Sequence, residues 1–353
     1  MNPFLVNLVN LIIGDLFENA AGIQDLGDIF IGGFGDDQLQ GGDNDDLFFG
    51  GPGDDSVLAG AGNDVIFAGT GNDTVVGQTG NDVAFLGSGH DRFIWNNGDG
   101  SDFINGGAGF DVTQVNGADG PGDEFDLSQV DGQALFNRLN LGLFTLTNEN
   151  IEQFEINGQG GDDSLTVGDL TGSDVEAVVF SGGEGNDFLN ASGTLTPVVA
   201  DGGAGDDILI GGAGDDILIG GDGADLLIGG AGNDILIGGQ GADLFAFAVG
   251  LAPSGLGNNL IQNFGAEDSI VLDTNLFAAL TSTVDGAIAT GEFTVVSSPE
   301  EAALSDAKIA YSSATGALYY NPNGTADGFG NGAQIATIEG APAINEDSFA
   351  VQV

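Results

Sequence analysis

Apolar residues recur every nine residues in two parts of the chain, each at the centre of a short triplet that follows a run of Gly and Asp. Because glycine reaches positive φ without penalty, the Gly- and Asp-rich runs are expected to be turns. Alternate side chains of a strand point to opposite faces, so each triplet is expected to be a strand whose central side chain faces inward. These central positions are Phe30, Leu39, Phe48, Val57, Ile66, Val75, Ala84 and Phe93, then Leu209, Leu218, Leu227, Leu236 and Phe245.

Two such nonapeptides complete one coil of 18 residues, which gives two parallel sheets with rungs about 4.8 Å apart. The predicted fold class is therefore all-β: a parallel β-roll or β-helix solenoid with calcium in the turns, followed by a C-terminal β-domain.

An Asp stands two residues before the central apolar residue of each repeat, so the coil places these carboxylates in rows along its two edges. A row of carboxylates roughly 5 Å apart repels itself unless a cation lies between the rungs. Carboxylate oxygens and backbone carbonyls at a flexible turn suit Ca²⁺ better than Mg²⁺ or Zn²⁺. The candidate metal ligands are Asp28, Asp37, Asp46, Asp55, Asp64, Asp73, Asp82 and Asp91, the outlying Asp111, Asp163 and Asp187, and Asp207, Asp216, Asp225, Asp234 and Asp243.

The repeats GGPGDDSVL (50–58) and GGAGDDILI (202–210 and 211–219) resemble the GGxGxDxUx nonapeptide of RTX (repeats-in-toxin), or hemolysin-type, calcium-binding proteins. The resemblance implies a β-roll that binds several Ca²⁺ ions, with each sixth-position Asp bridged to the Asp 18 residues on. It implies about six ions in the first array and about three in the second. Asn44, Gln78 and Ala224 depart from the consensus and weaken individual sites.

The amino-acid composition excludes several classes of binding partner and catalytic site. Lys plus Arg number 3 against 54 Asp plus Glu, a formal net charge of -51, which argues against partners such as nucleic acid or anionic lipid. There is no Cys and one His, His90, so thiol catalysis and His-rich zinc centres are excluded. We expect no enzyme and no catalytic residues, although the acids Asp123, Glu124, Glu149, Glu152 and Glu155 leave a polysaccharide-acting enzyme open. Glu152 and Glu155 fit alternating strand positions exposed to solvent.

Five segments are expected. Residues 1–27 form an apolar N-terminal cap or donor segment, too short to span a membrane. Residues 28–115 form the first β-roll, 116–181 wider solenoid coils, and 182–247 the second β-roll. Residues 248–353 form a C-terminal β-domain, and its acidic and apolar end, EDSFAVQV, resembles the uncleaved signal read by type I secretion machinery. The chain is thus expected to be secreted, extracellular or on the cell surface.

The outward positions of one sheet are apolar, including Ile31, Phe49, Phe67 and Phe85, and the second array is apolar on both faces. An apolar patch of this size is normally covered. Either the N-terminal segment or residues 248–353 cover it, or a second copy does.

We expect a calcium-binding structural protein that folds on Ca²⁺ outside the cell and self-associates into a filament, matrix or surface layer. The alternatives are a calcium-dependent adhesin or carbohydrate-binding module, with Trp95, Tyr311, Tyr319 or Tyr320 against sugar, and the enzyme named above.

Overall fold

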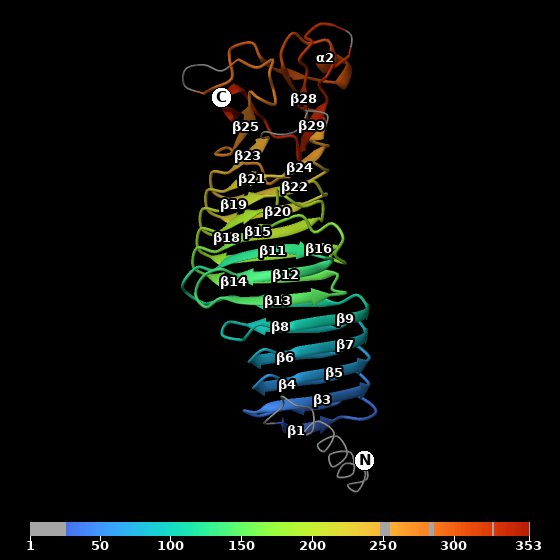
Figure 1. The fold of residues 1–353 in the computed structure, drawn as a ribbon. Helices are drawn as coiled ribbons and strands as arrows, with labels where there is room; N and C mark the ends of the chain where they lie inside the picture. The colour runs from blue at the N-terminus through green and yellow to red at the C-terminus, as the bar shows by residue number, and fades with distance from the viewer. Residues whose placement is uncertain (1–25, 248–254, 282–285, 327, 353) are drawn as a thin grey trace. The chain divides into compact units, whose positions relative to one another are not determined.

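The protein is a parallel β-solenoid of about 14 turns, with 51% of residues in strands and 3% in helices (Figure 1). The structure is a computed structural model, and it describes residues 26–247, 255–281, 286–326 and 328–352. The predicted fold class is confirmed. The N-terminal cap or donor segment lies, apart from its last residues, outside the described residues.

The chain divides into two compact units, which we describe separately. Unit 1 contains Met1–Asp119, Asp123–Gly158 and Leu170–Val179. Unit 2 contains Gly120–Gly122, Gln159–Asp169 and Phe180–Val353. The last change from unit 1 to unit 2 along the chain falls within strand β16 (Ala177–Glu184).

Unit 1 contains two sheets. The first has the strand order β1 (Leu26–Ile31), β3 (Asp45–Pro52), β5 (Val65–Thr70), β7 (Val83–Gly89), β9 (Phe103–Gly109), β13 (Phe144–Glu149), β12 (Gln133–Arg138) and β11 (Glu124–Val130). The second has the order β2 (Gln38–Gln40), β4 (Ser56–Ala61), β6 (Thr74–Thr79), β8 (Arg92–Asn96), β10 (Val112–Asn116) and β14 (Gln153–Gly160).

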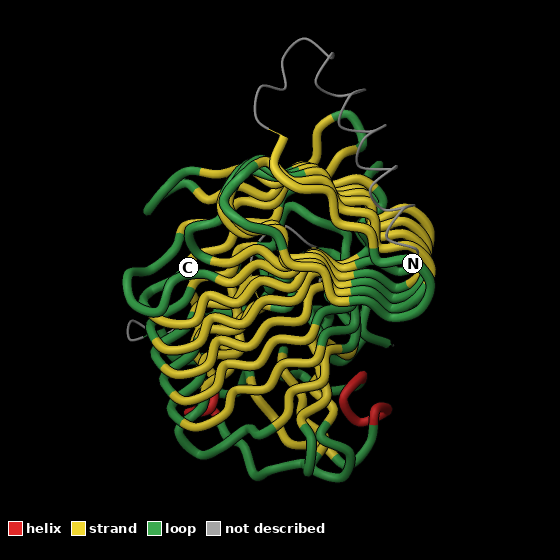
Figure 2. The backbone as a smooth tube through the Cα atoms, turned by 90° about the horizontal axis from the view of Figure 1, so that it is seen from below, coloured by secondary structure: helices red, strands yellow, loops and turns green. Residues whose placement is uncertain are grey.

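The coil of unit 1 has the predicted length. Parallel pairing aligns Leu47 with Val65 and Val65 with Val83, so that each strand lies beside the equivalent strand one coil later. The central residues of the triplets point inward: Phe48, Val57 and Ile66 have no exposed surface. Seen along the coil, the strands of successive coils lie in offset rows one behind another, with the turns at the edges (Figure 2).

After β10 the nine-residue register is interrupted by three consecutive antiparallel strands. Leu127 of β11 lies opposite Phe136 of β12, and Phe136 lies opposite Leu146 of β13. The parallel coil then resumes, because β13 pairs with β9 and β14 pairs with β10. The segment is thus an antiparallel meander inserted into the parallel coil.

Unit 2 repeats the two-sheet architecture. One sheet has the order β15 (Ser164–Val167), β17 (Phe188–Asn190), β19 (Ile208–Ile210), β21 (Leu226–Ile228), β23 (Leu244–Phe247), β25 (Ser269–Asp273) and β30 (Phe349–Gln352). The other has the order β18 (Val198–Ala204), β20 (Ile217–Asp222), β22 (Ile235–Gln240), β24 (Asn259–Gln262), β29 (Gln334–Ile338), β28 (Ala317–Tyr320), β27 (Ile309–Ser312) and β26 (Phe293–Val296). The short helices are α2 (Pro299–Ala303) and η2 (Glu346–Ser348).

The C-terminal strands extend the sheets of unit 2. Strand β30 pairs in parallel with β25, and β29 pairs in parallel with β24. Strand β28 is antiparallel to both of its neighbours, β27 and β29. The core of the repeats is again apolar, since Leu209, Leu218 and Leu227 have no exposed surface.

The outward apolar positions are mostly half-buried. In unit 1, Phe67 is 40% exposed and Phe85 is 37% exposed, and their rings stack with centroids 5.2 Å apart. Phe49 stacks on Phe67 in the same way at 5.4 Å. In unit 2, Ile208 and Leu244 are exposed to a similar degree. Among the helices that the structure describes, none has the length and apolar character needed to cross a membrane.

Candidate metal-binding loops

Asp55 shows how one repeat is tied to the next. Its side chain is buried, and its Oδ1 accepts a 2.8 Å hydrogen bond from the Asp37 N–H, 18 residues earlier. Its own N–H donates to Oδ1 of Asp73, 18 residues later, at 2.8 Å. The remaining oxygen, Oδ2, is buried and has no hydrogen-bond partner among the described residues. Successive coils are thus linked by a direct hydrogen bond from a backbone N–H to a carboxylate, and at Asp55 one carboxylate oxygen remains to be satisfied.

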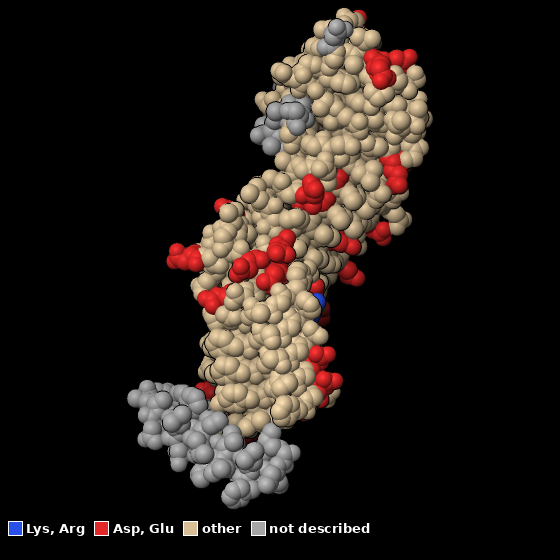
Figure 3. Space-filling model, turned by 90° about the vertical axis from the view of Figure 1, so that its right-hand side faces the viewer, with Lys and Arg blue, Asp and Glu red and all other residues tan. Residues whose placement is uncertain are grey.

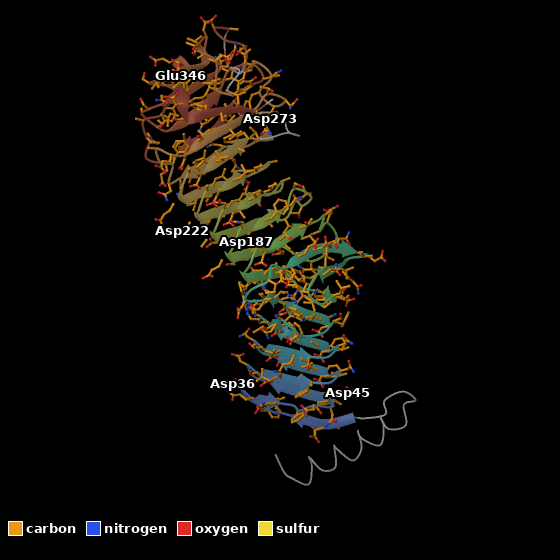
Figure 4. All side chains as sticks on the ribbon, turned by 90° about the vertical axis from the view of Figure 1, so that its left-hand side faces the viewer. Asp36, Asp45, Asp187, Asp222, Asp273 and Glu346 are labelled. Atoms are coloured by element: carbon orange, nitrogen blue, oxygen red, sulfur yellow. The ribbon has the colours of Figure 1, made fainter. Side chains whose placement is uncertain are left out.

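The same kind of hydrogen bond, from a backbone N–H to a carboxylate, connects all the candidate aspartates in four rows, two in each unit. In unit 1 the rows are Asp28, Asp46, Asp64, Asp82 and Asp102, and Asp37, Asp55, Asp73, Asp91, Asp111 and Glu152. In unit 2 they are Asp163, Asp187, Asp207, Asp225, Asp243 and Asp268, and Asp216, Asp234 and Asn259. Figure 4 shows Asp36 and Asp45, nine residues apart, at opposite edges of the first coils.

Glycine makes this packing possible. A Cβ on Gly50 would lie 2.4 Å from Oδ2 of Asp55 and 2.3 Å from the carbonyl oxygen of Ala68. Gly53 has φ +137°, and a Cβ there would lie 2.3 Å from the carbonyl oxygen of Gly35 in the preceding coil. The loops therefore bring backbone carbonyl and carboxylate oxygens together at distances that exclude any side chain.

Burial raises the pKa of most of these carboxyl groups. The largest cause is desolvation of the charged form, backbone N–H donation opposes it, and neighbouring aspartates raise the pKa further. The pKa of Asp82 is raised to about 8, with the fields of Asp102, Asp64 and Asp99 adding to burial. It is raised to about 7 at Asp91, Asp102, Asp207 and Asp234, and to about 6 at Asp64, Asp73, Asp187, Asp216 and Asp225.

Two predicted ligands differ from the rest because both of their oxygens accept backbone hydrogen bonds. Oδ2 of Asp46 accepts from the Gly42 N–H at 3.0 Å, and Oδ2 of Asp216 accepts from the Gly212 N–H at 2.7 Å. Neither loop has the positive φ at its second glycine that the other repeats show, for example at Gly51. We call this the closed loop conformation, in contrast to the open loops whose Oδ2 has no partner.

Sequence reasoning missed four members of the rows: Asp102, Asp268, Glu152 and Asn259. Asp102 accepts from the Asp82 N–H across 20 residues, and Asp268 accepts from the Asp243 N–H across 25. Oε2 of Glu152 accepts from the Asp111 N–H, so this side chain does not lie in a strand as a solvated residue. Each of the four stands two residues before a fully buried apolar residue, such as Ile104 or Phe154, and that spacing was the available signal.

The side chains that precede the row aspartates form a second, exposed ladder of hydrogen bonds. In this ladder a side chain accepts from the N–H of the following coil, whereas a row aspartate accepts from the preceding coil. Oδ1 of Asp36 accepts from the Asp54 N–H, and Oδ1 of Asp54 accepts from the Asn72 N–H, in each case 18 residues later. His90 belongs to this ladder: its N–H donates to Asn72, and its Nδ1 accepts from the Phe110 N–H at 3.0 Å.

Of the other acids singled out in the sequence, Glu124 is exposed, and the remaining three are engaged in structural contacts. Asp123 pairs with Arg138, and Glu155 pairs with Arg92, which lowers the pKa of Glu155. Glu149 accepts from the side-chain amides of Asn105 and Gln133. The aromatic residues considered for sugar contact, Trp95, Tyr311, Tyr319 and Tyr320, are all buried.

The residues present fit a calcium ion. The orphaned Oδ2 atoms of the open loops are buried anionic oxygens, and the neighbouring donors are glycine-exposed carbonyls, a hard oxygen set that Ca²⁺ prefers. Within the described residues no three acidic or histidine side chains converge, and an ion held here would need backbone carbonyls among its ligands.

This combination of a parallel coil and stacked Gly-Asp loops defines a calcium-binding type of β-solenoid. The chain matches the family model of the RTX calcium-binding nonapeptide repeat at residues 25–57, 58–93, 97–112, 178–193, 199–227 and 211–245, and these repeats belong to that family. No curated protein matches the chain.

Proposed function

We propose that the chain is a secreted structural protein that folds when it meets Ca²⁺ outside the cell and then self-associates. The observation that carries the proposal is the set of rows of buried Asp side chains, each open loop holding an oxygen without a partner. Without a cation or a proton, such rows of charges are strongly unfavourable. In a calcium-poor cytosol the chain then stays unfolded and fit for type I export, and calcium binding and folding occur together outside.

Calcium titration followed by far-UV circular dichroism tests the folding step. The β signal is expected to be small in EDTA at neutral pH and to appear cooperatively with millimolar Ca²⁺. Mg²⁺ at the same concentration is the control, and it is expected to give little structure because it demands a stricter geometry. A full β signal in EDTA, stable to heating, would overturn the proposal.

Self-association is supported by the outer faces. Phe67 and Phe85 are exposed and stacked in unit 1, and the acids gather in patches with broad uncharged surface between them (Figure 3). In calcium the protein is expected to form ordered assemblies by negative-stain microscopy. The variant F67S/F85S is expected to remain monomeric, while L58S, at a similarly exposed position of the opposite sheet, assembles normally. Monomeric wild-type protein in calcium would contradict this step.

The engaged state of Asp123, Glu149 and Glu155 supports a role without catalysis. An adhesin or carbohydrate-binding role, and polysaccharide turnover, remain the alternatives. Glycan-array binding would favour the first and release of reducing sugar the second.

A further inference from the structure

Arg138 is one of three Lys or Arg residues in the whole chain, and it lies in the interior of unit 1. Its side chain is 2% exposed, and it forms an ion pair with Asp123, whose side chain is fully buried. Its Nη1 also donates to Oδ1 of Asn97 at 2.7 Å. A charge at this depth is retained only with a partner, so the position of this rare arginine requires a structural explanation.

The loop that ends at Asp123 has the features of a repeat loop. Oδ2 of Asp123 accepts from the Ala118 N–H at 2.8 Å, as Oδ2 of Asp46 does from Gly42. A Cβ on Gly117 would lie 2.4 Å from this Oδ2, the same distance as between Gly50 and Asp55. Asp123 thus occupies the place of a row aspartate, with a guanidinium at its other oxygen.

The residues around this pair have a core of their own. Trp95 stacks on Phe144 with ring centroids 3.8 Å apart, and Phe136 packs against Phe125, Phe144 and Phe154 at 5.2, 6.0 and 6.2 Å. Trp95 also donates to the carbonyl of Gly100. Aromatic pairs of this kind contribute about 0.5–1.5 kcal/mol each beyond their buried area.

The topology of the meander is local. Strands β11, β12 and β13 are consecutive and antiparallel, so they form without the long-range pairing that the parallel coils need. Their outward side chains bond to one another: Thr145 donates to Asn137, and Gln133 donates to Glu149. Nothing in this arrangement depends on an added ion.

We propose that the meander, with β14 and the loop containing Asn97, is a calcium-independent folding nucleus, in which Arg138 serves as the internal cation. This folding nucleus rests on the proposed function in one respect, namely that the flanking repeats need calcium to fold. A unit of about 60 residues is only marginally stable, so such a nucleus stays compatible with export of an extended chain.

Hydrogen exchange of the full-length protein in EDTA at neutral pH tests the proposal. Amides of β11, β12 and β13 are expected to exchange at least about tenfold more slowly than those of β4 and β6. Uniformly rapid exchange, with the meander as unprotected as the repeats, would overturn the nucleus and leave the calcium-dependent fold intact. Protection throughout the chain would overturn the proposed function instead.

Variants test the role of Arg138 itself. In EDTA, R138Q is expected to lose the protection of the meander, because Asp123 is left buried without a counter-charge. The double variant D123N/R138Q, which removes both charges, is expected to regain it. R92Q is the matched control, since Arg92 forms its ion pair at a half-exposed position, and it is expected to leave the protection unchanged. An R138Q protein as protected in EDTA as the wild type would refute the internal cation.

Discussion

Asp207 and Asp216 occupy the same place in two identical nonapeptides, GGAGDDILI, yet only Asp216 holds both carboxylate oxygens in backbone hydrogen bonds. Oδ2 of Asp207 is buried without a partner. The preceding coil explains the difference. On the side of Asp216 it is the non-repeat segment 190–198, whose Thr194 and Ala191 carbonyls lie against Gly212. A loop is therefore open only where its neighbour supports that conformation.

This pair gives a direct test of which aspartates bind calcium. D207N is expected to lower the calcium stoichiometry, because an open carboxylate loses its charge. D216N is expected to leave the stoichiometry unchanged and to cost about 1–3 kcal/mol of stability, because its new amide NH₂ faces the Gly212 N–H. Equilibrium dialysis with radioactive calcium measures the first effect and thermal unfolding the second. Equal loss of calcium in both variants would show that closed loops bind ions too.

The same comparison shows what sequence could predict. The coil, the inward residues and the rows of Asp followed from the nine-residue period, because glycine and alternation dictate them locally. The closed conformation at Asp216 did not, because an identical nonapeptide adopts the open one at Asp207. Asp102 and Asp268 were missed for a related reason. Insertions in a loop leave the coil intact in space but break the period along the chain.

Acid is expected to replace calcium as a folding agent. The folded pKa values of the row aspartates, up to about 8 at Asp82, lie above the ordinary aspartate value of 3.8, so the folded state binds more protons between these two pH values. The stability of the metal-free fold therefore falls as pH rises from about 4 to about 8, and acid favours folding. In EDTA, circular dichroism is expected to show a β signal near pH 5 that is lost near pH 8.

Protons and calcium then compete for the same oxygens. As the pH falls from 8 through the pKa values near 7, such as that of Asp91, the folded protein is expected to bind calcium more weakly, yet less calcium is needed for folding because protonation already stabilises the metal-free fold. D82N, which removes the most strongly perturbed carboxyl, is expected to extend metal-free folding to higher pH. A calcium midpoint independent of pH would contradict the assignment of these groups.

Loop glycines differ in the cost of a methyl group. Gly35 and Gly71 both have positive φ, but a Cβ on Gly71 would lie 2.0 Å from the carbonyl oxygen of Gly53, whereas Gly35 has open space. G35A is expected to cost about 1–2 kcal/mol from backbone strain alone. G71A is expected to cost several kcal/mol more, because two stacked coils must separate. Thermal unfolding in saturating calcium measures both, and equal losses would show that coil spacing is not limiting.

His90 tests whether the outer ladder contributes to stability. Its Nδ1 accepts from the Phe110 N–H, as the Asn and Asp side chains at equivalent positions do for the coils that follow them. H90N places at this position one of the two side chains, Asn and Asp, that most equivalent positions carry, and it is expected to keep the wild-type melting temperature in calcium. H90A leaves the Phe110 N–H to water, and since this site is exposed the loss is expected to be about 0.5–1 kcal/mol. Identical melting temperatures for H90A and H90N would mean that the inner rows alone hold successive coils together, and that the exposed ladder only follows their spacing.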